Sequence, residues 1–365
     1  MKVCLIGNSL TSLVLAKILA NKKINVFLYY NKKSFSYSKN RTIGISKTNL
    51  DYLNTEVHKL KKNIFWDINE IEVYSSKYED NRILEFNKPK SVLFSMFKNN
   101  DVYKLIDNSL KKNKFFKKFL IKDAKFYKTI LLNRDYDLII NCENNNPISK
   151  KLFYKKIIKD YNSLAYTSII NHQKFSNNKA VQVFTEKGPI AFLPISNNKT
   201  SIVFSKINQE RDVNDLEIKK LIFKNNKDYQ IKKFKKFEKF PLKFSATRSY
   251  YYGNVMEFGD SLHRIHPLAG QGFNMTLRDL KKLSKIIQNK IDLGLNLDHS
   301  IYEEFQKETM HYNSIFLFGI DFIYEFFKFD SNYKNNYSNK IFKFINKNKF
   351  FNRIVSKYAD EGLSL

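Results

Sequence analysis

The stretch that decides the fold is residues 254–274, NVMEFGDSLHRIHPLAGQGFN. It begins as a short apolar strand and passes through Gly259, Asp260, a proline and a Gly-Gln-Gly triplet into a helix. A helix is predicted there because apolar residues recur with a period of about 3.6 residues, at Leu277, Leu280, Leu283, Ile286 and Ile287. Glycines in such a turn let backbone N–H groups approach a flat ring at the positive end of the helix dipole, and Asp260 can accept a hydrogen bond from a polyol hydroxyl.

A second signal lies at the N-terminus. Apolar runs at residues 3–6 and 24–30 flank an amphipathic helical stretch, which predicts the strand-helix-strand unit where nucleotide-binding domains place their phosphate turn. Of the G-x-G-x-x-G pattern only Gly7 remains, and Ser9 and Ser12 stand at the other two glycine positions. The acidic residue expected at the end of the second strand is replaced by Tyr29 and Tyr30.

The rest of the chain alternates between two kinds of pattern. Strands are predicted at residues 119–121, 129–132 and 137–141, after a helix at 101–112, and half-buried antiparallel strands are predicted at 63–90 and through most of 161–244. These patterns predict a discontinuous nucleotide-binding domain and a β lobe, followed by a helical region. The predicted ranges are 1–62, 92–160 and 245–295 for the nucleotide-binding domain, 63–91 and 161–244 for the β lobe, and 296–365 for the C-terminal helical region.

Length and composition agree with two lobes. The chain has 365 residues, of which 43% are apolar, and single cores stop growing at roughly 250–300 residues. The two cysteines, Cys4 and Cys142, cannot make a disulfide scaffold, and no Cys/His cluster has the spacing of a zinc site. We expect a folded protein of a reducing compartment with no metal.

The net charge of +29 comes almost entirely from lysine, since only eight of the 64 cationic residues are arginine. Lysine is scattered along the chain together with many Asn, Ile, Phe and Tyr, a composition that A+T-rich codons produce without any ligand. Base readout favours arginine and no nucleic-acid reader motif is present, so we expect no nucleic-acid partner. An anionic membrane surface is the alternative partner for this charge.

The ends of the chain bear on location. The start MKVCLIG predicts a strand and lacks the features of a signal peptide, and no apolar run approaches the ~20 residues of a spanning helix. We expect a cytoplasmic protein, with peripheral binding at the inner face of the membrane as a second hypothesis. Residues 315–358 carry stripes of Phe, Ile and Tyr beside Lys, for example Ile341 and Phe342, which would suit either packing on the first domain or an interfacial patch.

In the stretch 254–274 the chain resembles the class A flavin-dependent aromatic hydroxylases, and among them the ubiquinone-biosynthesis hydroxylases. Residues 184–194, FTEKGPIAFLP, and 41–46, RTIGIS, also resemble family segments, and the family's arginine at the position of Arg41 lies near the flavin. The family motif G-D-A-A-H-x-x-H-P-x-A-G-Q-G-x-N is matched at Gly259, Asp260, His263, His266, Pro267, Ala269, Gly270, Gln271, Gly272 and Asn274.

The resemblance implies an α/β aromatic hydroxylase fold, with a Rossmann-like three-layer domain for FAD and NAD(P) and a second, mainly antiparallel β substrate lobe. It implies FAD as the cofactor and a monooxygenase that hydroxylates the ring of a polyprenylated phenol in ubiquinone biosynthesis. In that family O2 reacts as a flavin C4a-hydroperoxide, and NAD(P)H or an electron-donor protein supplies the electrons. A biosynthetic complex is a further candidate partner.

The resemblance also implies site residues. Asp260 would hold the ribityl chain, Pro267 would lie beside the flavin near the reacting oxygen, and His266 is the second catalytic candidate. The histidines have an alternative explanation as buried side chains that fix the turn. The implied FAD contacts are Gly7, Ser9, Ser12, Arg41, Gly259, Asp260, Pro267, Ala269, Gly270, Gln271, Gly272 and Asn274.

The departures from the family pattern gather at the adenosine end of the site. They are the two lost glycines, the missing ribose acid, and the family's D-G pair, which is Glu143-Asn144 here. A second hypothesis is therefore a non-catalytic or weakly FAD-binding paralogue that acts as a structural member of a ubiquinone-biosynthesis assembly.

Overall fold

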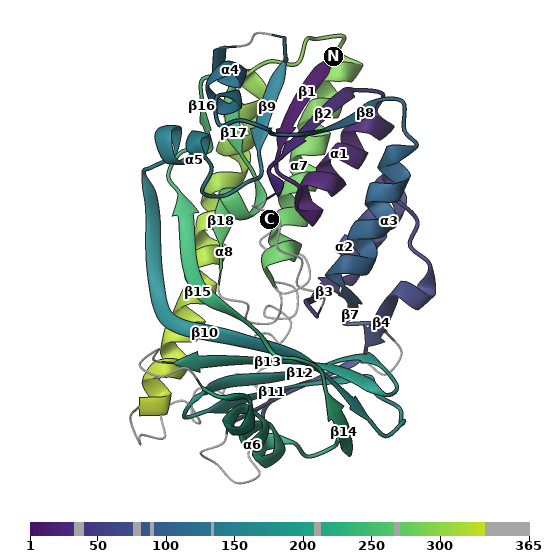
Figure 1. Cartoon of the computed structure of the whole chain (residues 1–365), viewed down its shortest axis with the longest axis vertical. Helices are drawn as coiled ribbons and strands as arrows, with labels where there is room; N and C mark the ends of the chain where they lie inside the picture. Colours follow the sequence, from purple (N-terminus) through teal and green to yellow (C-terminus); the bar gives the residue numbers. More distant parts are fainter. Residues whose placement is uncertain are drawn as a thin grey trace.

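The computed structural model describes residues 1–32, 40–75, 82–87, 91–132, 135–207, 213–265 and 271–332. A mostly parallel sheet with helices on both faces lies above a larger, mainly antiparallel sheet in Figure 1. A third, small sheet joins the two. This is the predicted α/β class with a second β lobe.

The parallel sheet has six strands and is covered on both faces. Its strand order is β16 (Tyr251–Tyr252), β17 (Val255–Glu257), β9 (Leu138–Asn141), β1 (Lys2–Ile6), β2 (Asn25–Tyr30) and β8 (Phe116–Leu120). The covering helices are α1 (Leu10–Asn21), α3 (Asn99–Lys111) and α7 (Gln271–Asp292) on one face, and α4 (Phe126–Leu132) and α5 (Pro147–Leu152) on the other. Val3 and Leu5 pack into the first layer and Cys4 and Ile6 into the second, which explains why β1 is apolar without alternation.

The large sheet forms the β lobe. Its strand order is β18 (His263–Arg264), β15 (Glu238–Thr247), β10 (Lys156–His172), β13 (Lys199–Ile207), β12 (Gly188–Ser196), β11 (Lys179–Thr185), β5 (Glu70–Ser75) and β6 (Arg82–Asn87), and β14 (Ile231–Phe234) also pairs with β10. Helix α6 (Asp215–Asn225) covers one face, where Tyr166, Phe204 and Ile218 form a core. The opposite face is turned toward the parallel-sheet domain.

The small sheet has the strand order β3 (Thr42–Ser46), β7 (Phe94–Lys98) and β4 (Phe65–Ile68). In the chain, β3 and β4 are separated by α2 (Lys47–Tyr52) and the short helices η2 (Leu53–Val57) and η3 (Lys62–Ile64). Strand β4 falls in the range predicted for the β lobe, yet it pairs with β7 from the range predicted for the nucleotide-binding domain. Strand β10 likewise runs through residue 160 without a break. The division into domains stays a prediction.

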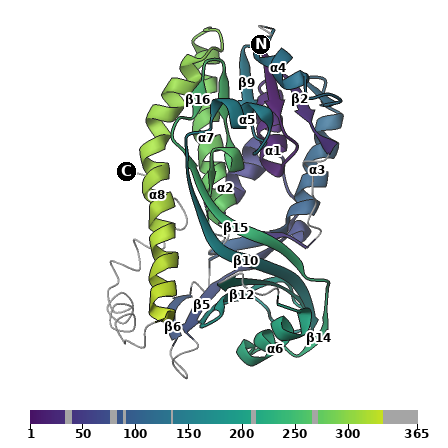
Figure 2. The same cartoon turned by 60° about the vertical axis from the view of Figure 1, so that its left-hand side comes forward.

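Helix α8 (Ser300–Asn332) runs along both sheets, as Figure 2 shows. Near its start the Tyr302 hydroxyl contacts the backbone of Ile139 in β9 at 2.8 and 3.0 Å. Near its far end Asp321 accepts from Lys159 of β10 at 2.9 Å. The helix therefore fastens the two lobes together, and none of the described helices is long and apolar enough to cross a membrane.

One predicted strand is wrong. The apolar run at residues 129–132 predicts a strand, but these residues form the end of α4. Ile130 is buried against the sheet while Leu132 is exposed, which is the one-sided burial of a surface helix. A run of four apolar residues does not distinguish a strand from a buried helical turn, because the periodicity needs a longer window.

Candidate functional site

The turn after β1 requires a glycine. Gly7 has a φ of +116°, and a Cβ built on it would lie 3.2 Å from the carbonyl carbon of Cys142 and from the Cβ of Glu143. The close passage of the chain after β9 therefore excludes a side chain at this position. The turn places the N-terminus of α1 at the carboxyl edge of the parallel sheet, where open α/β sheets bind their ligands.

Two serines stand where the family has glycines, and they cap α1. The Ser9 hydroxyl accepts from the Ser12 N–H at 3.2 Å, and the Ser12 hydroxyl accepts from the Ser9 N–H at 3.3 Å. This capping box satisfies two of the donors at the helix start. The N–H groups of Leu10 and Thr11 have no acceptor within a helix of this geometry, so they stay available to an anion.

The chain after β17 meets the same helix end. Gly259 has a φ of +64°, and a Cβ on it would lie 2.7 Å from Cγ2 of Thr11. Gly259 opens the short helix η4 (Gly259–Ser261), on which Asp260 is exposed. Segments some 250 residues apart are thus in contact, and they bring the Asp260 carboxylate to the edge that holds the N-terminus of α1.

Cys142 marks the point where these segments converge. Burial raises the pKa of the Cys142 thiol to about 12, a hydrogen bond with Ser12 acts in the opposite direction, and the charge of Asp260 raises it again. Such interactions require Ser12 and Asp260 to lie close to Cys142. The three residues come from α1, η4 and the end of β9, which are the segments that the sequence motifs predict to form one site.

Neither cysteine is expected to react with a maleimide in the folded protein. Burial raises the pKa of Cys142 to about 12 and also raises that of Cys4, so the reactive thiolate is scarce near neutral pH. Both thiols should be labelled after unfolding in guanidinium chloride, as counted by mass spectrometry. Rapid labelling of Cys142 in the native protein would contradict the closed junction described above.

A buried ion pair between Lys156 and Glu257 stabilises η4, and no sequence motif predicts this pair. Lys156 Nζ lies 2.7 Å from Oε2 of Glu257 and donates to the carbonyl of Ser261 at 3.0 Å. Glu257 also accepts hydrogen bonds from the hydroxyls of Ser149, Thr247 and Ser261. Burial raises the pKa of Glu257, although the neighbouring ammonium and hydroxyl groups act in the opposite direction. The network ties the start of β10 to the turn that carries Asp260.

His263 has a structural role in the described residues. Its Nε2 lies 2.6 Å from Oδ2 of Asp279 in α7, and both side chains are buried. Asn313 of α8 donates to the other Asp279 oxygen at 3.0 Å. The histidine therefore anchors the turn to α7 and, through Asp279, to α8.

Asn274 fastens the small sheet to α7. Its amide donates to the carbonyl of Gly44 at 2.9 Å, and its Oδ1 accepts from the Ser46 N–H and from the Asn49 amide, both at 3.0 Å. Arg41 lies just before β3 and is exposed, and its carbonyl accepts from the Asn99 N–H. Asn274 thus positions neighbouring backbone, and its predicted contact with the cofactor stays a prediction, as does that of Arg41.

Part of the predicted site lies outside the described residues. These positions are His266, Pro267, Ala269 and Gly270, and the side chain of Gln271 belongs with them. Gly272 is described, and a Cβ on it would meet only Ile265 at 3.8 Å. Packing within the described chain does not require a glycine there, which suits a position that a ligand approaches closely.

The far end of the edge carries a cation beside Tyr30, which stands with Tyr29 where the family has an acid. Lys118 lies 5.2 Å from the centre of the Tyr30 ring and 2.7 Å from Asp107. Burial raises the pKa of Asp107, but its bonds to Lys118 and Lys111 outweigh this and hold the pKa below its ordinary value. Both carboxylate oxygens are therefore engaged, and the predicted loss of the ribose acid is matched by a local surplus of positive charge.

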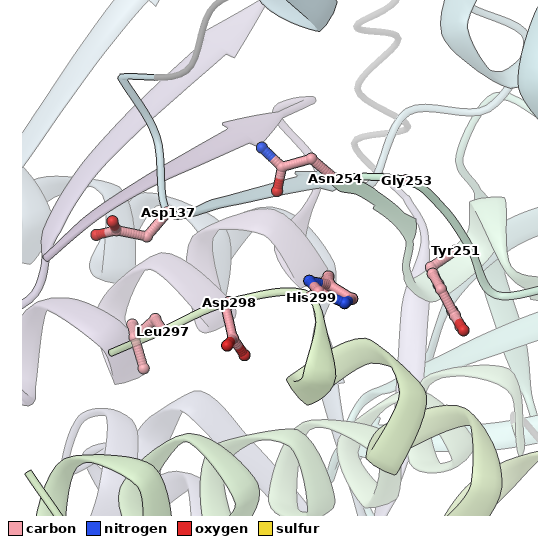
Figure 3. Close-up of a pocket in the computed structure, with 7 residues that line it drawn as sticks. All are labelled: Asp137, Tyr251, Gly253, Asn254, Leu297, Asp298 and His299. Atoms are coloured by element: carbon pink, nitrogen blue, oxygen red, sulfur yellow. The ribbon is translucent and has the colours of Figure 1, made fainter. Parts of the chain in front are cut away.

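A pocket of about 380 Å³ opens at the opposite edge of the parallel sheet (Figure 3). Asp137 lies there beside the start of β1, since its N–H donates to the carbonyl of Lys2 at 2.9 Å. The pocket therefore lies at the amino ends of β1 and β9, away from Gly7 and Asp260. Its lining residues are Asp137, Tyr251, Gly253, Asn254, Leu297, Asp298 and His299.

Three carboxylates of the β lobe, Glu70, Glu72 and Glu85, lie close enough together to suggest a cation site. Glu72 is paired with Arg82 at 2.9 Å and with Lys179 at 3.0 Å. The cluster is thus an ion-pair network within the β lobe, and we assign no metal to it.

Comparisons with known proteins agree with this geometry. Residues 155–292 match a family model described as FAD binding domain. The ubiquinone biosynthesis monooxygenase COQ6 of Dictyostelium discoideum, a mitochondrial protein, is 25% identical over 301 residues, which are 67% of this chain and 61% of that protein. The 3-demethoxyubiquinol 3-hydroxylase of Escherichia coli K12 is 30% identical over 151 residues, which are 39% of this chain and 38% of that protein. The chain thus matches less than two thirds of the length of either relative.

Solved structures show the same fold. The p-nitrophenol 4-monooxygenase PnpA from Pseudomonas putida superposes with a TM-score of 0.72 at 12% identity, covering 98% of this chain and 97% of that one. PqsL from Pseudomonas aeruginosa in complex with 2-aminobenzoylacetate gives 0.70 at 13% identity, covering 91% and 97%. The predicted fold class and the resemblance to flavin-dependent ubiquinone hydroxylases are confirmed, and the cofactor is FAD.

The described residues fit FAD at the centre of the carboxyl edge. Gly7 and Gly259 allow the closest approach of three backbone segments, α1 offers N–H groups to a pyrophosphate, and Asp260 offers an exposed carboxylate beside them. At the adenosine end the fit is looser, because Tyr29 and Tyr30 stand where a ribose acid is usual and the ammonium of Lys118 lies beside Tyr30. The described side chains thus favour the pyrophosphate and the ribityl chain over the adenosine.

Proposed function

Because this chain is related to the FAD-dependent ubiquinone hydroxylases, we propose that it is a monooxygenase that hydroxylates the aromatic ring of a polyprenylated phenol on the route to ubiquinone. The observation that carries the proposal is the junction of α1, η4 and the end of β9, where two positive-φ glycines and Asp260 meet. O2 and a reduced nicotinamide or an electron-donor protein are the proposed co-reactants, and a biosynthetic complex is a proposed partner.

The proposed roles follow from position and chemistry. Bound FAD supplies the activation of O2 that ring hydroxylation requires. The N–H groups of Leu10 and Thr11 would bind the pyrophosphate, and Asp260 would accept hydrogen bonds from the ribityl hydroxyls. Gly272 would let the backbone at the start of α7 approach the ring, and the large sheet would shield the reaction from water. Pro267 and His266 stay the proposed residues beside the reacting atoms.

The experiment that tests this proposal begins with the visible spectrum of the purified protein. We expect FAD near one equivalent per chain. The FAD-loaded protein should then convert a short-chain polyprenylphenol to a product heavier by one oxygen atom, with ¹⁸O taken from labelled O2. Bound FAD without oxygen incorporation would contradict the hydroxylase, and a protein that neither contains nor takes up FAD would contradict both parts of the proposal.

Replacing Asp260 with Ala is expected to weaken FAD binding about 10- to 100-fold, because a charge-assisted hydrogen bond is lost from an exposed group that supports little else. The apo protein should be titrated with FAD by flavin fluorescence. Asp292→Ala, at the end of α7, is the matched control and should leave the affinity unchanged. Equal FAD affinity of the Asp260 variant and the unaltered protein would remove Asp260 from the site.

We also propose peripheral binding to an anionic membrane surface. Ile315, Phe318 and Phe322 are exposed on α8, and the chain carries a net charge of +29. Vesicles with phosphatidylglycerol should float the protein at low ionic strength, and binding should weaken as salt is added. At the same low ionic strength, Phe318→Ser should float less than the unaltered protein. Absence of flotation at low salt would contradict the proposal. The stripe around Ile341 and Phe342, which the sequence also offers for this role, lies outside the described residues.

A further inference from the structure

One face of the large sheet is turned toward the domain that binds FAD. On the opposite face, Tyr166 of β10 and Phe237, just before β15, pack with α6. Side chains alternate along a strand, so Thr167 and Glu238 point to the other face. The register pairs Thr167 with Glu238 on one side and with Val203 on the other, and no bulge interrupts either pairing near them. Directly opposed residues have Cβ atoms roughly 4.5–5.5 Å apart, so Thr167 and Glu238 are neighbours on this face.

Contacts on both sides place these two residues in the interface between the large sheet and the parallel-sheet domain, which we call the seam. Two residues before Thr167, Ala165 packs in the cluster that contains Met275 of α7. Two residues after Thr167, Ile169 pairs with Ser201, whose hydroxyl accepts a hydrogen bond of 2.8 Å from Thr42 of the small sheet. The Asn40 amide donates to the carbonyl of Lys236, two residues before Glu238. The seam is therefore closed at both ends, with Thr167 and Glu238 between the closures.

Among the described residues, the seam holds a polar side chain without a hydrogen-bond partner. Thr167 is 6% exposed, and its hydroxyl makes no hydrogen bond within the described part of the chain. Leaving such a group unpaired in the interior is unfavourable, so a hydroxyl in this position suits a partner beyond the described side chains, and a bound ligand would supply one. Glu238 beside it is half-buried, and the small residues Ala191 and Val203 on the same face are also only half-buried. A face bounded by domain contacts but incompletely covered suits a flat apolar ring.

We propose that Glu238 and Thr167 form the polar end of the substrate site, where they bind the phenolic hydroxyl. This inference rests on the proposed function. The Glu238 carboxylate accepts the phenolic proton while the O–H bond breaks and its electron pair stays on the oxygen, which makes the ring more electron-rich for attack. The Thr167 hydroxyl donates to that oxygen. The proton then passes from Glu238 to water at its exposed side, so atoms and charge balance without another reactant.

The test compares 2-farnesylphenol with its methyl ether, which lacks the proton that Glu238 accepts. Binding to the FAD-loaded protein is followed by perturbation of the flavin absorption band. The unaltered protein should bind the phenol about tenfold more tightly than the ether, and Glu238→Gln and Thr167→Val should each reduce this preference toward one. Thr167→Ser keeps the hydroxyl and should keep the preference. Turnover of the phenol should fall about 100-fold in Glu238→Gln.

Controls separate this inference from its premise. Glu217→Gln changes an exposed carboxylate of α6, on the other face of the same lobe, and should behave as the unaltered protein. Each variant should retain its FAD content and visible spectrum, which shows that it is folded. A preference for the phenol that survives in both Glu238→Gln and Thr167→Val would overturn the inference while leaving the hydroxylase intact. An unaltered protein without FAD would instead overturn the proposed function, and the inference with it.

Discussion

Replacing Lys156 with Met is expected to lower the free energy of unfolding by about 3–5 kcal/mol, the largest loss we expect from a single substitution in this chain. Lys156 is almost fully buried and lies 2.7 Å from Glu257, which has no exposed surface. Without the ammonium group, the carboxylate would be a buried charge with only hydroxyl partners. The loss should appear in urea unfolding followed by circular dichroism.

The dependence on pH identifies the cause of this loss. Burial already raises the pKa of Glu257, so the folded protein binds its proton more readily than the unfolded chain does. Glu257 therefore lowers the stability of the fold as the pH rises from the ordinary pKa of a glutamate toward the higher pKa that Glu257 has in the folded protein. Removing Lys156 raises that pKa further and widens the range of pH over which stability is lost. The variant should accordingly recover much of its stability when the pH is lowered and Glu257 becomes neutral.

Two further variants make the prediction testable in both directions. Lys156→Met combined with Glu257→Leu removes both charges and should unfold with nearly the free energy of the unaltered protein. Lys243→Met breaks an exposed ion pair with Asp160 at 3.2 Å and should change stability by no more than about 0.5 kcal/mol. Equal losses in the buried and the exposed lysine variants would show that the Glu257 network is not closed to water.

The second large effect is expected for Gly259→Ala, which should lower the free energy of unfolding by about 2–4 kcal/mol. The left-handed conformation with a φ of +64° costs an alanine about 1–2 kcal/mol, and the 2.7 Å approach to Thr11 Cγ2 adds an overpacking cost of about 1–3 kcal/mol. Because the clash is with the first turn of α1, FAD affinity should fall as well. Thermal unfolding and FAD titration measure the two effects.

The chain contains a matched control for this substitution. Gly253 also has a positive φ, +54°, but nothing lies within 4 Å of a Cβ built there. Gly253→Ala should therefore show the conformational cost alone, and the difference between the two variants measures the contact with Thr11. Thr11→Ser removes the Cγ2 atom and should restore part of the stability of Gly259→Ala. If Gly253→Ala and Gly259→Ala were equally destabilised, η4 would not press against α1.

Local patterns were sufficient for the elements that carry their own periodicity. The strand, turn and helix around Gly7, and the turn from Gly259 into α7, follow from residues that are neighbours in the chain. The short apolar run at residues 129–132 was insufficient, since four residues allow either a strand or the end of α4. The division into domains stays a prediction, because sheet pairing and not local pattern bears on it: β4 pairs with β7 across the predicted division, and β10 passes through it.

Within the site, the same distinction separates motif residues from their supports. Gly259 and Asp260 belong to a contiguous motif, and their chemistry can be inferred from residue type and order. The residues that hold them come from elsewhere: Lys156 lies about 100 positions before Glu257, and Asn274 bonds to Gly44 some 230 positions away. Such pairs carry no local signal, because a buried lysine and an exposed one look alike in a sequence composed so largely of lysine.

The order of residues in this chain was enough to specify a flavin-binding α/β protein with a β lobe, since a phosphate turn and a ring-binding turn depend on glycines and capping residues only a few positions apart. Which polar groups share a buried space depended on strand register and on the docking of the lobes. Thr167 and Glu238, 71 positions apart, face the same seam only because the pairing of β10 with β15 is regular from Ser163 to Thr167, and a shift of one residue there would turn one of them toward α6.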